Sequence, residues 1–138
     1  MTMKFARGLF EHPYLPEDED GVRVPYDLHP ESLQMARESL ILLQNKGDLL
    51  PLTKETARGK KLAVIGPNAD NVYSQLGDYT PPLRREDGVT VLDGVRALYQ
   101  ESDVRFAQGC WLRKADAALL EEAKALAEDS DAVICVLG

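Results

Sequence analysis

Residues 61–70 read K-L-A-V-I-G-P-N-A-D, and this stretch decides the fold. An apolar run follows two lysines and stops at Gly66-Pro67, which is typical of a buried strand that ends in a turn. Open α/β sheets bind their ligands outside the carboxyl ends of the strands. The residues that follow Gly66 are therefore the first place to expect a functional site.

Downstream of this strand, the sequence alternates between helix and strand patterns. Thr90, with Asp93 three residues later, forms a variant capping box in front of an apolar helical run. Residues 104–107 predict a second strand, and residues 132–137 a third, whose unbroken apolar run is typical of burial on both faces. A second helix is predicted at 116–128, with its inward face formed by Leu119, Leu120, Ala123, Leu126 and Ala127. This order predicts an α/β fold with a parallel sheet and right-handed crossovers.

Residues 1–30 do not have the pattern of a domain. The acidic run E-D-E-D-G at 17–21 predicts an extended, solvated loop. A helix is predicted to begin at Pro30 and to end near Asn45. The uniformly apolar run at 40–43 leaves a second reading open, in which the helix gives way to a short strand.

Composition narrows the class of protein. The chain has 138 residues, of which 16 are basic and 23 acidic, so no basic surface is expected to bind nucleic acid. No apolar run approaches the roughly 18 residues of a membrane-spanning helix, so no membrane partner is expected. The first residues have no signal-peptide pattern, and localisation stays open. Cys110 and Cys135 are expected to be buried free thiols.

Four residues are candidates for contact with a substrate. Asp70 and Asp78 follow the first predicted strand, where each can face a ligand or stabilise a local turn. Tyr79 and Trp111 can each stack on a sugar or pack internally, and Trp111 comes just after the second strand. Neither a G-x-G-x-x-G nor a Walker sequence is present, so no nucleotide cofactor is expected. The spacing of the residues indicates no metal ligand set.

Several segments in the chain occur in a recognisable order. They are K-F-A-R-G-L-F-E-H-P-Y at 4–14, H-P-E-S-L-Q-M-A-R-E-S-L-I-L-L-Q-N-K-G-D-L-L-P-L at 29–52, L-A-V-I-G-P-N-A-D at 62–70, Q-L-G-D-Y-T-P-P at 75–82 and V-T-V-L-D-G-V at 89–95. The ordered set resembles glycoside hydrolase family 3, the β-glucosidases and β-xylosidases. The first segment resembles the end of that family's barrel domain, and the others resemble the start of its second domain.

The resemblance implies a fold and an activity. Family members pair a TIM-like barrel with an α/β sandwich domain, and they remove β-linked sugars from non-reducing ends with retention. Residues 1–30 then correspond to the linker after a missing barrel domain. Residues 31–138 correspond to the first part of a parallel-sheet, three-layer sandwich that stops before it is complete. Retaining glycosidases need two carboxyl groups roughly 5 Å apart. The resemblance implies that both lie outside this chain, so no catalytic residue is assigned here.

Two functions remain open from the sequence. In the first, the chain is part of a β-glucosidase or β-xylosidase and is inactive alone. Its partners are then the barrel domain and, through the full-length enzyme, an oligosaccharide or aryl β-glycoside. In the second, it is a non-catalytic α/β binding or interaction module. A chain that leaves one face of its sheet uncovered is also expected to self-associate.

Overall fold

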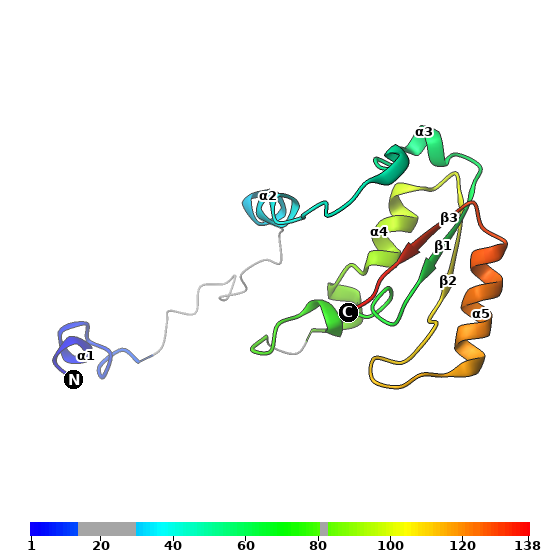
Figure 1. The fold of residues 1–138 in the computed structure, drawn as a ribbon. Helices are drawn as coiled ribbons and strands as arrows, with labels where there is room; N and C mark the ends of the chain where they lie inside the picture. Colours follow the sequence, from blue (N-terminus) through cyan, green and yellow to red (C-terminus); the bar gives the residue numbers. More distant parts are fainter. Residues whose placement is uncertain (14–29, 81–82) are drawn as a thin grey trace. The chain divides into compact units, whose positions relative to one another are not determined.

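The computed structural model describes residues 1–13, 30–80 and 83–138 (Figure 1). The chain forms two compact units, Met1–Gln44 and Asn45–Gly138. The acidic loop expected at 17–21 lies outside the described residues. The expected boundary between a linker and an α/β domain, after residue 30, stays a prediction.

The described residues of the first unit form two helices, α1 (Thr2–Ala6) and α2 (Pro30–Glu38). After α1, the rings of Phe5 and Phe10 lie 4.5 Å apart between centroids. Helix α2 begins where expected but ends early, and residues 40–43 form neither further helical turns nor a strand. The predicted helix and the alternative short strand at 40–43 were therefore both wrong. Short helices and single strands are stabilised mainly by packing, and these four side chains are 63% to 92% exposed.

The second unit is built on a parallel sheet of three strands: β1 (Lys61–Ile65), β2 (Asp103–Ala107) and β3 (Ala132–Cys135). The strand order is β2-β1-β3, so β1 lies in the centre of the sheet. Residues 62–64 of β1 are fully buried. The predicted parallel α/β fold and the three predicted strands are therefore confirmed.

Two helices cover the sheet, α4 (Val91–Leu98) on one face and α5 (Ala117–Glu128) on the other (Figure 1). The result is three layers, as expected. The predicted capping box is present: the Asp93 N–H donates to Thr90 Oγ1 (3.1 Å), and the Thr90 N–H donates to Asp93 Oδ2 (2.9 Å). Asp116 caps α5 by accepting two N–H bonds from its first turn.

Shorter elements complete the second unit. They are α3 (Lys54–Ala57) and three 3-10 turns, at Lys46–Asp48, Tyr73–Gln75 and Arg85–Asp87. The core lies mainly between β1 and α4, where Val64 packs with Leu92 and Ala69. Tyr99 is buried at the end of α4, and its hydroxyl donates to the Leu52 carbonyl (2.7 Å).

The third strand and the second helix differ from expectation in their burial. β3 ends at Cys135, and its side chains are half-buried and exposed in alternation. The prediction of burial on both faces was wrong because β3 is an edge of the described sheet and α5 contacts β2 and β1. Cys135 is consequently exposed, whereas Cys110 is half-buried, and both thiols are free. Leu120 is also exposed and lines an open hollow at the start of α5 instead of facing inward.

Candidate functional site

The carboxyl ends of the three strands are held together at Gly66. Its N–H donates to the Ala107 carbonyl at the end of β2 (3.1 Å), and the Val136 N–H beyond β3 donates to the Ile65 carbonyl (2.7 Å). Gly66 has φ +136°, and a Cβ there would lie 2.1 Å from the Val136 carbonyl oxygen. Only glycine permits this approach. The loops that follow β1 and β2 therefore leave the sheet at one edge.

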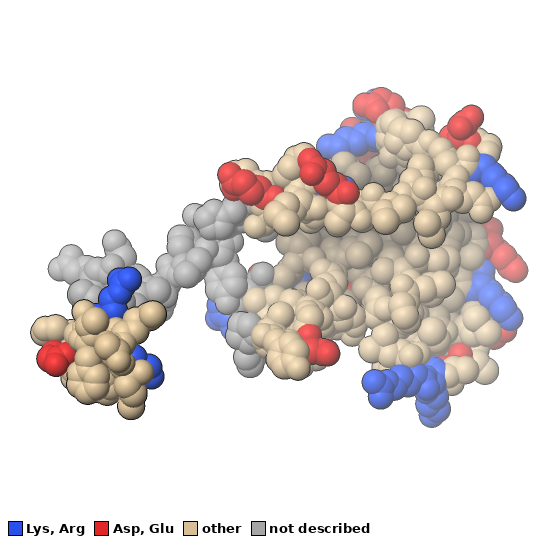
Figure 2. Space-filling model, turned by 60° about the vertical axis from the view of Figure 1, so that its left-hand side comes forward, with Lys and Arg blue, Asp and Glu red and all other residues tan. Residues whose placement is uncertain are grey.

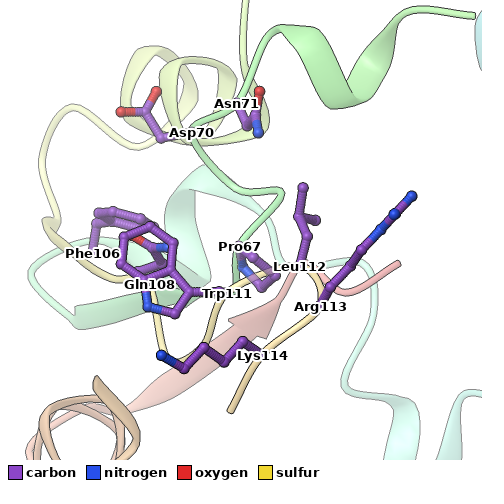
Figure 3. Close-up of a pocket in the computed structure, with 9 residues that line it drawn as sticks. All are labelled: Pro67, Asp70, Asn71, Phe106, Gln108, Trp111, Leu112, Arg113 and Lys114. Carbon is purple, nitrogen blue, oxygen red and sulfur yellow. The ribbon is translucent and has the colours of Figure 1, made fainter. Parts of the chain in front are cut away.

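The loop after β1 is fixed to the core by Ala69. This residue is fully buried, and its carbonyl accepts the Leu92 N–H from the first turn of α4 (2.9 Å). Asp70 and Asn71 follow directly and so hold a set position at the carboxyl edge of the sheet. Their side chains form one wall of a pocket (Figure 3).

The loop after β2 forms the other wall. Gly109 turns the chain with φ +73°, and a Cβ there would lie 3.3 Å from the Ile65 side chain. Residues 111–114 then form a tight turn in which the Trp111 N–H donates to the Lys114 carbonyl (3.0 Å). The Trp111 indole N–H points to Asp116 Oδ2 at 3.4 Å, which links the turn to the residue that caps α5.

The pocket between these walls has a volume of about 930 Å³, within the range typical of small-molecule sites. Its lining is formed by Pro67, Asp70, Asn71, Phe106, Gln108, Trp111, Leu112, Arg113 and Lys114. Two of the four predicted site residues, Asp70 and Trp111, thus meet in one pocket although they are far apart in sequence. Trp111 is 52% exposed, so its indole has free surface for a ligand.

Asp70 is already engaged by neighbouring side chains. Its Oδ1 accepts from Arg85 Nη2 (2.8 Å) and from the Thr90 hydroxyl (3.2 Å). The same Arg85 nitrogen donates to Asp93 Oδ2 (2.9 Å). The pKa of Arg85 is raised, mainly by its hydrogen bond to Asp93 and to a smaller extent by Asp70. The pKa of Asp93 is lowered, mainly by its hydrogen bonds with Thr90 and to a smaller extent by Arg85. This network fixes the loop and gives Asp70 a structural role whether or not it also touches a ligand.

The other two candidates lie outside this pocket. Tyr79 is fully exposed, and Asp78 is also exposed. Beside them, the Thr80 hydroxyl donates to the Gly77 carbonyl (3.0 Å) and closes a local turn. Their contact with substrate stays a prediction.

Sequence reasoning missed the polar residues that accompany Trp111. Gln108, Arg113 and Lys114 belong to the same loop and line the same pocket. Their positions in the sequence could have identified them. Gln108 directly follows the predicted strand at 104–107, and Arg113 and Lys114 are two and three residues after the candidate Trp111. Across the residues described here, no group of three or more His, Cys, Asp or Glu side chains is arranged to hold a metal ion. Among those same residues, no helix is long and apolar enough to span a membrane.

The fold and the pocket define an open, parallel-stranded α/β domain whose candidate site lies at the carboxyl edge of the sheet. Residues 40–138 match the model of the glycosyl hydrolase family 3 C-terminal domain. The chain therefore belongs to glycosyl hydrolase family 3.

Individual relatives agree with this assignment. The chain is 36% identical to a β-xylosidase of Formosa agariphila in an alignment that covers all of this chain and 20% of the relative. A solved β-glucosidase from Listeria innocua, in complex with isofagomine, is similar with a TM-score of 0.72 and 31% identity, over 99% of this chain and 18% of that one. A mutant of the same β-glucosidase, in complex with laminaribiose, gives a TM-score of 0.73 at 30% identity, with the same coverage. The chain thus spans about one fifth of the length of these relatives.

Proposed function

We propose that this chain is part of a retaining, exo-acting β-glycosidase that removes terminal β-linked glucose or xylose from oligosaccharides. In this proposal, the chain contributes a wall of the sugar site and does not catalyse hydrolysis alone. The full-length enzyme, with its barrel domain, binds the oligosaccharide or aryl β-glycoside.

The observation that carries the proposal is the half-exposed Trp111 in a pocket at the carboxyl edge of the sheet. Aromatic rings present an apolar face that suits the apolar face of a pyranose, while polar groups around them bind the hydroxyls. Gln108 and Asn71 supply amide groups on the same pocket. Family membership, together with relatives that are β-xylosidases and β-glucosidases, supports a glycosidic substrate.

The charge arrangement supports inactivity of the chain alone. Retention by two carboxyl groups requires a nucleophile and an acid/base roughly 5 Å apart. Among the described residues that line the pocket, Asp70 is the one carboxylate, and it is bound by Arg85 and Thr90. A carboxylate held in this way is poorly placed to attack a sugar or to transfer a proton.

A binding experiment tests the sugar pocket directly. We expect cellobiose and xylobiose to shift the amide NMR signals of residues 108–114 in this chain. Trp111→Leu should weaken the binding roughly fivefold, because lost aromatic contact is worth about 1 kcal/mol. Tyr73→Leu is the matched control, since Tyr73 is 80% exposed and does not line the pocket. Sugar-induced shifts that avoid these residues, or that persist unchanged in Trp111→Leu, would contradict the proposal.

A further inference from the structure

Two cationic side chains lie on the wall of the pocket that carries Trp111. Arg113 and Lys114 are two and three residues after Trp111 in sequence, and both are exposed. Neither forms an ion pair with a carboxylate among the described residues. The chain has a net charge of −7, so carboxylates are abundant, and charged groups of both signs are mixed on the face drawn in Figure 2. These two adjacent cations, without a carboxylate partner among the described residues, place positive charge beside an aromatic surface.

The geometry of the turn places one of these cations next to the aromatic surface. The backbone bond between Trp111 and Lys114 brings the two residues together across the turn. In Figure 3, the Lys114 side chain extends toward the side of the pocket where the Trp111 and Phe106 rings lie, and Arg113 extends in the opposite direction. A ligand that lies on the indole is thus within the field of Lys114, with Arg113 as a more distant positive charge.

The two walls of the pocket differ in charge. On the wall formed by the loop after β1, Arg85 is shared between Asp70 and Asp93, which leaves a net negative group. Asp116 also lies near Trp111, but it accepts the indole N–H and two N–H groups from the first turn of α5. An anionic group on a ligand is therefore favoured beside Lys114 and disfavoured beside Asp70.

We propose that this pocket binds an anionic sugar, with the sugar ring on Trp111 and its carboxylate or sulfate group beside Lys114 and Arg113. The proposal rests on the proposed function and deepens it by naming a substrate class. The preferred oligosaccharides carry a uronic acid or a sulfated sugar next to the neutral sugar that is removed. Lysine and arginine bind carboxylate and sulfate oxygens by charge-assisted hydrogen bonds, so either anionic group fits the site.

The test compares sugars that differ in charge at constant ionic strength. The probes are methyl β-D-glucuronide, glucose 6-sulfate and neutral methyl β-D-glucopyranoside, with sodium sulfate as an anion without a sugar. Trp111 is the single tryptophan of the chain, so its fluorescence reports on this pocket. Isothermal titration calorimetry on the same samples detects binding that leaves the fluorescence unchanged. We expect at least one anionic sugar to bind roughly fivefold tighter than the neutral sugar, the size suited to an exposed charge pair. This preference should weaken as salt is raised.

Variants separate a charge contact from a general effect of net charge. Lys114→Gln should remove most of the preference for the anionic sugar, and the double change with Arg113→Gln should abolish it. Lys60→Gln is the matched control, because it removes the same charge just before β1, at the opposite edge of the sheet, and should leave the preference unchanged.

Three outcomes would overturn the inference. They are equal binding of charged and neutral sugars, a preference that survives the double change, and sodium sulfate that binds as tightly as the anionic sugars. The first of these leaves the proposed glycosidase function intact, because a neutral sugar still occupies the Trp111 pocket. A glucuronide preference and a sulfate preference each support the proposal and decide between its two anionic groups.

Discussion

Replacement of Gly66 by alanine tests how the strand ends position the site. An alanine Cβ at this position would lie 2.1 Å from the Val136 carbonyl oxygen and 2.8 Å from its carbon. Both atoms belong to the backbone that follows β3, so no side chain can rotate away. The backbone would have to move by roughly an ångström to restore even a tight contact, and the 2.7 Å bond from the Val136 N–H to the Ile65 carbonyl would be strained.

The expected cost has two parts. Overpacking against a fixed backbone typically costs about 1 to 3 kcal/mol. Holding alanine at φ +136° adds roughly 1 to 3 kcal/mol, because this region is accessible mainly to glycine. We therefore expect Gly66→Ala to lower the free energy of unfolding by about 2 to 6 kcal/mol.

The assay is urea-induced unfolding followed by the fluorescence of Trp111. Gly94→Ala is the matched control, since Gly94 lies in α4 and nothing lies within 4 Å of the Cβ it would gain. That change should instead raise the free energy of unfolding by about 0.5 to 1 kcal/mol, through helix propensity. The reasoning is refuted if Gly66→Ala unfolds within about 0.5 kcal/mol of the unchanged chain.

Three further predictions concern hydrogen bonds within the second unit. Thr90→Val should lower the free energy of unfolding by about 1 to 2 kcal/mol in urea titrations, because it removes the helix cap and the hydroxyl bound to Asp70; an unchanged midpoint would count against this. The pKa of Asp93 is lowered in the folded chain. The largest cause is the hydrogen bond from the Thr90 backbone N–H, and the Thr90 side chain and Arg85 contribute less. The stabilisation from Asp93 is therefore present above the ordinary pKa of 3.8 and lost as the pH falls below it. Thermal melting of Asp93→Asn should show a shallower loss of stability over that acid range, and an identical slope would exclude the network as a cause. Tyr99→Phe should cost about 1 kcal/mol in urea titrations, because it leaves the partly buried Leu52 carbonyl without its 2.7 Å partner; no change would mean that water replaces the bond.

Local patterns predicted much of the fold. The capping box at Thr90 and Asp93 depends on residues three positions apart, so the sequence contains the whole interaction. The turn at Gly66-Pro67 and the strand before it were also predicted from neighbouring residues, although their hydrogen-bond partners lie in and beyond β2 and β3. The alternation of strands and helices then predicted a parallel sheet with right-handed crossovers, and the family resemblance implied the three layers.

The errors arose where burial depends on distant parts of the chain. The apolar run at 40–43 predicted a helix or a short strand, and the run in β3 predicted burial on both faces, but periodicity does not reveal whether another element covers either run. Likewise, Leu120 has the spacing of a core residue, yet it is 49% exposed and lines the hollow at the start of α5. For the site, the sequence supplied Asp70 and Trp111 separately, while their shared pocket depends on the order of the strands.

The most direct test of the account is hydrolysis of aryl β-D-glucosides and aryl β-D-xylosides by the purified 138-residue chain. The chain should first show a cooperative thermal transition, so that its fold is established. The account predicts no release of the aryl group above the blank for either substrate. Release that follows the chain through a second purification would contradict it, and would show that catalytic carboxylates lie within these residues.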